Sequence, residues 1–144
     1  MEKTEKKKIG RIEKIHFPEW SISNLDAKVD TGAYTSSLHC HHIKEFTKGD
    51  EKWIQFNVLD PDHPEYESIL YKSKVHDVRK VKSSNAITEE RFVIKEKVVF
   101  SGETRSIELS LTDRSGMKYP ILLGRKFLNK YIIDTSRTYL TELK

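Results

Sequence analysis

The chain has 144 residues, of which 36% are hydrophobic and 33% charged, and this length and composition fit one globular domain with a single core. It contains no apolar run near the ~20 residues that would span a membrane, and its net charge of +4 is too small for the clustered positive face of a nucleic-acid binder. The single cysteine, Cys40, excludes an internal disulfide framework and is typical of a reducing compartment, so we expect a cytoplasmic protein without membrane or nucleic-acid partners.

The N-terminal residues 1–8 hold four lysines and two glutamates, which account for half of the net positive charge. We expect a flexible basic tail there, and no secretory signal, because no apolar stretch follows it. Residues 9–144 show no internal repeat and no linker rich in Pro, Gly or Ser, so they are predicted to form a single domain.

Short segments rich in Val, Ile, Tyr, Phe and Thr make up most of this domain, and Gly, Pro, Asn and Asp separate them, which predicts strands. Several alternate apolar and polar residues, as a strand with one buried face does. The predicted strands are residues 9–15, 25–29, 53–59, 92–100 and 107–111, with a loop at 61–64, a hairpin turn at 101–103 and a short helix at about 125–130. So many short strands with so little helix predict an all-β barrel or sandwich.

An Asp-Thr-Gly turn follows the short apolar strand that ends at Val29. A carboxylate at the end of a buried strand, here Asp30, is costly to bury without a reason. Thr31 can fix a turn through its hydroxyl, and Gly32 allows another backbone to approach closely. Taken alone, the tripeptide also fits an ordinary strand-to-turn junction, because Asp, Thr and Gly are common turn residues.

Five segments that span nearly the whole chain resemble one known family. They are Gly10-Arg11-Ile12-Glu13, residues 27–38, Val81-Lys82-Ser83-Ser84-Asn85, Glu90-Arg91-Phe92-Val93-Ile94, and residues 109–128 with Ile121-Leu122-Leu123-Gly124-Arg125. They resemble the retropepsin-like aspartic proteases, and among these a bacterial and archaeal family that also carries the name ATP-dependent zinc protease. Some of its members are associated with ATP-grasp glutamate ligases that modify a ribosomal protein. The resemblance implies an all-β, retropepsin-like closed β-barrel with one short helix and a homodimeric active site.

The resemblance also implies the chemistry of the Asp-Thr-Gly turn. In an aspartic protease two carboxylates share one proton, since two like charges about 3 Å apart cannot both ionise, and together they activate water. The chain has one such turn, so the second Asp30 would come from a second copy across a two-fold axis. Asp30, Thr31 and Gly32 would form the catalytic turn, with Thr31 linking the two turns by hydrogen bonds.

Residues 78–91 are polar and flanked by extended segments, and the resemblance implies that they form a flap hairpin over the substrate. The alternative is an ordinary solvent-facing hairpin. The family usually has Gly where this chain has Ala86, which alters the conformational freedom of the tip. The residues that the resemblance implies for substrate binding are Ala33, Ser83, Ser84, Asn85, Ile121 and Leu122.

Gly124 and Arg125 are implied as structural supports, Gly124 because it lets two backbone segments pass closely beneath the site. In retropepsins the equivalent Arg pairs with an Asp shortly after the Asp-Thr-Gly, but Tyr34 stands at that position here. Arg125 therefore needs another partner, which the sequence does not identify. The alternative is a surface residue at the start of a helix.

A metal site would have to use His39-Cys40-His41-His42. On a regular strand His39 and His41 point to one face, and Cys40 and His42 to the other. Two ligands on a face are fewer than the four of a structural zinc site or the three of a catalytic one, so we predict no metal. No phosphate-binding Gly-rich loop is present, and we predict no cofactor. The same geometry disfavours Cys40 as a nucleophile paired with a neighbouring histidine.

The sequence therefore predicts an aspartic-type endopeptidase in which one Asp30 from each subunit activates water. One alternative is a non-catalytic peptide- or partner-binding module on the same fold, and a less favoured one is a zinc metallopeptidase. The expected partners are a second copy of the chain and a peptide or protein substrate, with an ATP-grasp ligase as a further candidate.

Overall fold

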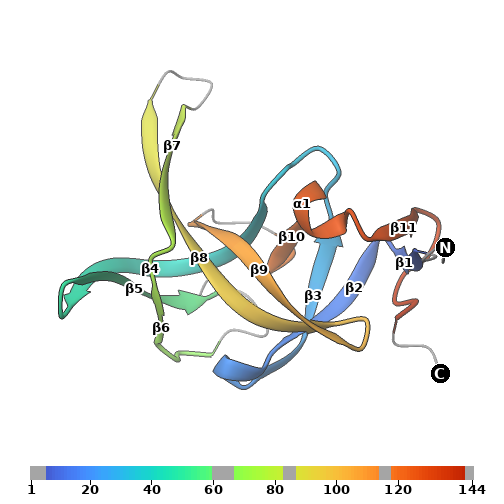
Figure 1. The fold of residues 1–144 in the computed structure, drawn as a ribbon, viewed down its shortest axis with the longest axis horizontal. Coiled ribbons are helices and arrows are strands. Elements are labelled where there is room, and N and C mark those ends of the chain that lie inside the picture. The colour runs from blue at the N-terminus through green and yellow to red at the C-terminus, as the bar shows by residue number, and fades with distance from the viewer. Residues whose placement is uncertain (1–5, 60–66, 83–86, 114–117, 142–144) are drawn as a thin grey trace, which may run out of the picture.

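Most of the described residues lie in strands (Figure 1), which confirms the all-β prediction. The computed structural model describes residues 6–59, 67–82, 87–113 and 118–141. The elements in chain order are β1 (Lys7–Gly10), β2 (Ile12–Phe17), the 3-10 helix η1 (Pro18–Trp20), β3 (Ile22–Val29), β4 (Ser36–Lys48), β5 (Glu51–Val58), β6 (Tyr71–Lys74), β7 (Asp77–Lys82), β8 (Thr88–Phe100), β9 (Glu103–Thr112), β10 (Ile121–Leu123), α1 (Arg125–Leu128) and β11 (Tyr131–Asp134). In these four ranges, no helix is both long enough and apolar enough to cross a membrane.

Nine of the described strands belong to one sheet with the order β10-β3-β2-β8-β9-β4-β5-β6, and β7 pairs with β8 at its side. The short β10 pairs in parallel with β3 and antiparallel with β4. The pairings therefore lead from β10 through β3, β2, β8, β9 and β4 back to β10. β1 and β11 form a separate parallel pair. As a result, β10 lies between the strand that precedes the Asp-Thr-Gly turn and the strand that follows it.

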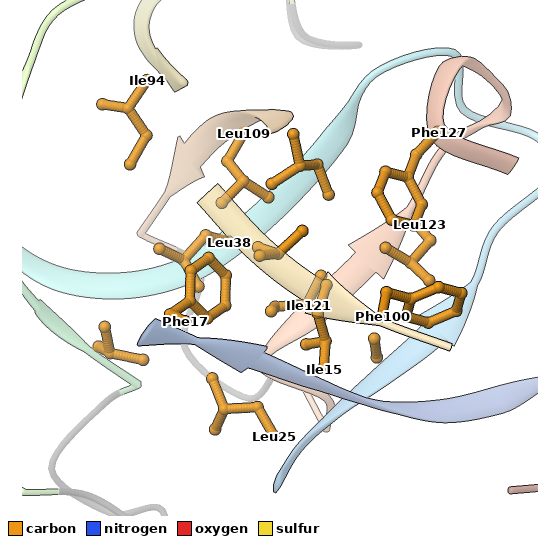
Figure 2. Packing of buried hydrophobic residues seen from close by; sticks show 14 of the residues in the cluster. Ile15, Phe17, Leu25, Leu38, Ile94, Phe100, Leu109, Ile121, Leu123 and Phe127 are labelled. Carbon is orange, nitrogen blue, oxygen red and sulfur yellow. The ribbon is translucent and has the colours of Figure 1, made fainter. Parts of the chain in front are cut away.

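The hydrophobic core lies where the apolar faces of these strands meet (Figure 2). Strand β9 buries Ile107, Leu109 and Leu111, which are every second residue, as the alternation in its sequence predicts. Phe100, at the end of β8, packs edge-on against Phe127 of α1 with ring centroids 5.2 Å apart. This contact packs the helix against the β8–β9 hairpin. The hairpin itself is also predicted by the sequence.

Several boundaries differ from the sequence-based expectations; the strand expected at 9–15, for example, is divided between β1 and β2. Three further differences have a clear structural reason. β1 begins at Lys7, inside the stretch expected to be a tail, because it pairs with β11. α1 ends at Leu128, earlier than predicted, because the chain soon extends to form β11 in that same pair. Strand β5 stops before Leu59, whose positive φ of 70° departs from the extended conformation. The loop expected at 61–64 lies outside the described residues.

Strands β7 and β8 form the hairpin that the sequence predicts around residues 78–91. Its pairs run from Asp77 with Val93 to Lys82 with Thr88. In Figure 1 the far half of this hairpin projects from the rest of the chain. The tip, with Ser83, Ser84, Asn85 and Ala86, lies outside the described residues.

The histidine-rich part of β4 does not keep the predicted alternation. The register of β4 against β5 shifts between His41 and Lys44, and His42 has a positive φ of 54°. His39 and Cys40 are both fully buried, and the rings of His41 and His42 meet edge-to-face with centroids 4.6 Å apart. The prediction that His41 and His42 point to opposite faces is therefore wrong, because a β-bulge rotates the chain at this point.

A buried carboxylate, Glu13 of β2, ties the C-terminal segment to the N-terminal strands. Its Oε2 accepts hydrogen bonds from the N–H groups of Gly10 (2.7 Å) and Leu140 (2.9 Å), and its Oε1 from the N–H (3.1 Å) and hydroxyl (2.8 Å) of Thr141. A Cβ on Gly10 would lie 2.5 Å from the carbonyl oxygen of Arg137. The first segment that carries the family resemblance, residues 10–13, thus has a structural role here.

Candidate active site

The Asp-Thr-Gly turn begins where β3 ends, and β10 holds its first residue. Val29 lies opposite Leu123 in the parallel pair, and the Asp30 N–H donates to the Leu123 carbonyl at 2.9 Å. Within the turn, the Ala33 N–H donates to the Asp30 carbonyl at 3.2 Å, and the Gly32 N–H donates to carboxylate Oδ1 at 3.0 Å. The carboxylate of Asp30 is therefore oriented by the backbone of its own turn.

Gly124 lies directly against the far side of this turn. A Cβ at Gly124 would lie 2.6 Å from the carbonyl oxygen of Tyr34 and 2.7 Å from the carbonyl carbon of Thr35, which is closer than any side chain allows. The Gly124 N–H donates to the buried Ser36 Oγ at 3.0 Å. Only a residue without a side chain fits this close approach of two backbone segments.

The first turn of α1 completes the contact between the two segments. The Arg125 N–H donates to the Ala33 carbonyl at 2.8 Å, and the Lys126 N–H donates to the Tyr34 carbonyl at 3.0 Å. The first N–H groups of a helix have no partner inside the helix, so the loop after Asp30 satisfies them. The sequence-based expectation that the Asp30 and Gly124 segments lie together is confirmed.

The side chain of Arg125 contacts the same turn. Its Nη1 donates to the Thr31 carbonyl at 2.9 Å. Its guanidinium lies 5.8 Å from the ring centroid of Tyr34, within the ~6 Å over which cations are attracted to aromatic faces. Tyr34 therefore contacts Arg125 through its aromatic ring, where a retropepsin has an Asp that forms an ion pair with the equivalent Arg. Arg125 supports the turn and is more than a surface residue.

The surface of the turn faces solvent. Asp30 is half-buried, Thr31 and Gly32 are exposed, and Tyr34 is 59% exposed. The turn therefore presents a carboxylate beside an exposed aromatic ring. A single carboxylate can act as a general base when ionised or as a general acid when protonated.

A family model described as "RimB-like: Retropepsin-like aspartic endopeptidase RimB" matches residues 8–144. The chain belongs to the RimB-like family. The match includes both the Asp30 turn and the Gly124 segment, so it confirms the family resemblance seen in the sequence.

Two bacterial relatives of this RimB-like chain are named "Probable alpha-L-glutamate ligase". The one from Shewanella pealeana is 36% identical over 132 residues, which are 91% of this chain and 29% of the relative. The one from Parasynechococcus marenigrum is 36% identical over 127 residues, which are 88% of this chain and 27% of the relative. The chain thus spans less than a third of the length of these curated relatives.

A crystal structure of a Legionella pneumophila protein described as having unknown function has the same fold as this RimB-like chain. The two align with a TM-score of 0.77 and 28% sequence identity. The alignment covers 94% of this chain and 98% of the Legionella chain.

The site residues expected from the sequence fall into three groups. Ile121 is fully buried in the core, and Leu122 beside it is half-buried. Ser83, Ser84 and Asn85 lie outside the described residues. Those that the structure brings together are Asp30, Thr31, Gly32, Ala33, Gly124 and Arg125.

The polar side chains that hold the segment after this turn were not expected from the sequence. Thr35 Oγ1 accepts a hydrogen bond from Arg79 Nη1 at 2.8 Å, and Ser36 holds Gly124. Glu108 of β9 binds Arg79 in turn. These partners are 29 to 88 residues apart in the chain, and their residue types are common on surfaces, so no local pattern marks them.

The donors near His39 to His42 do not fit the zinc in the family's other name. His41 Nδ1 lies 3.0 Å from Asp113 Oδ1, and His42 Nδ1 lies 2.8 Å from Asn57 Oδ1. Over the described ranges, no three His, Cys, Asp or Glu side chains gather closely enough to hold a metal ion. Burial raises the pKa of the Cys40 thiol far above its usual range, so Cys40 stays protonated and is a poor nucleophile.

Proposed function

We propose that the chain is an aspartic-type endopeptidase that works as a two-fold homodimer, with one Asp30 from each subunit. The observation that carries this proposal is the Asp30 turn, which its own chain holds rigidly from β10 and α1 while Thr31 and Gly32 remain exposed. A two-fold axis brings the same surface of two copies together, and so pairs the carboxylate with its copy without any further sequence. The circuit of pairings through β10 supports the closed-barrel form of a retropepsin for each subunit.

In the proposed dimer the two carboxylates hold one proton between them. The ionised Asp30 takes a proton from water as the water oxygen attacks the peptide carbonyl carbon, and the protonated Asp30 gives its proton to the carbonyl oxygen. The tetrahedral species then breaks its C–N bond as the Asp30 that took the proton from water protonates the leaving amine, and the other, now ionised, Asp30 takes a proton from a hydroxyl of the tetrahedral carbon. The pair again holds one proton. Water is the nucleophile, so no bond forms between enzyme and substrate. Thr31 of each subunit would hold the two turns together, and Ala33, Leu122 and residues 83–85 would contact the peptide.

We also propose a glutamate ligase as a partner of this activity. In relatives named "Probable alpha-L-glutamate ligase", the region similar to this chain makes up less than a third of the protein. The presence of this region and of the remaining sequence in one protein supports a shared task for the two. Co-purification of the tagged chain with a ligase of that kind from the same organism tests this. A ligase that is absent, or that is recovered equally from the untagged control, would contradict it.

A non-catalytic binding module is the second candidate function. The exposed ring of Tyr34 favours it, because aromatic side chains at a rigid surface are typical anchors for a bound peptide. In that case the same surface would bind an extended peptide and leave it uncut.

The experiment is cleavage of a broad peptide library by the wild-type protein, by Asp30→Asn and by Asp50→Asn, with dimer content followed by analytical ultracentrifugation. Asp50 is an exposed residue in the turn between β4 and β5, so its variant controls for the loss of one carboxylate. We expect Asp30→Asn to lose cleavage and keep the dimer, and Asp50→Asn to keep both. Cleavage by Asp30→Asn would overturn the catalytic assignment, and a wild-type dimer that binds peptides without cutting them would favour the binding module.

A further inference from the structure

Glu108 is the centre of an ion network next to the Asp30 turn. It lies on β9 between two residues of the buried face, and its side chain is only 14% exposed. Its Oε1 accepts a hydrogen bond from Arg79 Nη2 at 3.3 Å, and its Oε2 accepts one from Lys126 Nζ. One carboxylate thus holds two cations that come from different elements.

The guanidinium of Arg79 extends this network to the loop behind Asp30. Its Nη1 donates to Thr35 Oγ1 at 2.8 Å, and its Nε donates to Asp77 Oδ2 at 3.1 Å. Arg79 belongs to β7, at the base of the projecting hairpin. The planar guanidinium therefore fixes the hairpin base, the loop and β9 relative to one another, because its donors point in set directions.

Lys126 joins the third segment. Its N–H binds the Tyr34 carbonyl, and its side chain binds Glu108. The network therefore connects the hairpin that the sequence predicts as a flap with both segments that form the Asp30 site. Most exposed ion pairs contribute little to a structure, but this one is largely shielded from solvent at its carboxylate and branches in three directions.

We propose that Glu108 is a positioning residue of the Asp30 site, which holds the base of the β7–β8 hairpin against the Thr35 loop and α1 through Arg79 and Lys126. The proposal rests on the proposed endopeptidase function. Its consequence is that loss of Glu108 weakens the binding of the peptide between hairpin and turn and leaves the chemistry of the Asp30 pair largely intact.

The charge of Glu108 supports this role under the conditions in which an aspartic pair works. The hydrogen bond from Lys126 lowers the pKa of Glu108, and the positive charges of His76 and Arg79 add to the effect. Glu108 therefore stays ionised, and the network stays intact, further into the acid range than an ordinary glutamate would allow.

The test compares Glu108→Gln and Arg79→Lys with a control, Glu45→Gln. Glu45 also pairs with a lysine, Lys52 at 2.9 Å, but both side chains are about half exposed and belong to the β4–β5 hairpin. Amide hydrogen exchange is measured in residues 31–36, 77–82 and 51–58, and cleavage kinetics are measured on a peptide that the wild-type protein cuts.

For Glu108→Gln we expect exchange in residues 31–36 and 77–82 to rise about tenfold together, with residues 51–58 unchanged. We expect KM to rise about fivefold to tenfold with kcat within about twofold of wild type. Arg79→Lys keeps the positive charge but loses the planar guanidinium with its several N–H donors, and should show the same pattern to a smaller degree. Glu45→Gln should change neither readout.

Exchange that matches the Glu45→Gln control, exchange that rises equally in residues 51–58, or a fall in kcat at constant KM would each overturn the positioning role. If the wild-type protein cuts no peptide, the endopeptidase proposal fails by itself. The exchange pattern then still decides whether Glu108 orders the Thr35 loop and the hairpin base.

Discussion

Two carboxylates on adjacent strands, Glu13 on β2 and Asp30 at the end of β3, have opposite surroundings. Glu13 is fully buried and accepts four hydrogen bonds, from residues near both ends of the described chain. Asp30 is half-buried, and among the described residues its carboxylate accepts one hydrogen bond, from the N–H of Gly32. A carboxylate offers about four lone-pair sites, so Glu13 is saturated and Asp30 is not.

The difference separates a structural carboxylate from one that is available for chemistry. Saturation with donors compensates for burial and joins distant segments, but it leaves no site for a substrate or water. At Asp30 the hydrogen bonds go mainly to the backbone around the carboxylate, so its position is fixed while its oxygens remain accessible.

The largest effect is expected from Asp30→Glu, which keeps the charge and adds one methylene. A displacement of the carboxylate by about 1 Å should lower cleavage by about 100-fold or more. Wild-type activity should follow a bell-shaped pH profile with its maximum on the acid side of neutral, where the pair holds one proton. The measurement is kcat/KM against pH, with Asp50→Glu as the matched control. Equal activity of Asp30→Glu and wild type would place the chemistry elsewhere.

The second prediction concerns stability. Glu13→Ala leaves the buried N–H of Gly10 and the half-buried N–H groups of Leu140 and Thr141 without their acceptor, and should cost about 3–4 kcal/mol of unfolding free energy. Urea unfolding measures this cost, with Glu19→Ala as the control, because Glu19 is exposed on η1 and should change stability by less than about 0.5 kcal/mol. A cost below about 1 kcal/mol for Glu13→Ala would show that its hydrogen bonds are replaced by water, and the comparison with Asp30 would lose its basis.

The third prediction tests the close contact behind the turn. Gly124→Ala places a methyl group against the backbone of Tyr34 and Thr35, and the required shift should cost about 1–3 kcal/mol. Ser36→Ala removes only the hydroxyl that accepts from Gly124 and should cost about 1 kcal/mol. Thermal or urea unfolding of both variants checks this order. A Gly124→Ala protein as stable as wild type would mean that the Asp30 turn moves away easily.

The smallest effect is expected from metal removal. The His41 and His42 rings have oxygen partners in Asp113 and Asn57, so chelation should leave melting temperature and cleavage unchanged. Elemental analysis of the purified protein measures zinc directly. About one zinc per chain, lost in His41→Ala, would contradict this prediction and revive the metallopeptidase alternative.

The strand character of the chain and the identity of its central turn follow from the amino-acid sequence alone. Alternation fixes which side of β9 is buried, because side chains of a strand alternate at every residue whatever the neighbours are. The Asp-Thr-Gly of residues 30–32 and the later Gly124 also need no coordinates, since their local geometry follows from turn chemistry and from the missing side chain of glycine.

The contacts that support these parts depend on the three-dimensional fold. The bulge that turns His41 towards His42 depends on the register of β4 against β5. The alternation of side chains along a single strand cannot predict it. The partners of Arg125 and Glu108 follow from strand order, which brings residues many positions apart into contact. Hydrogen bonds and ion pairs form between groups about 3–4 Å apart in space, whatever their separation along the chain. Local sequence patterns therefore do not predict them.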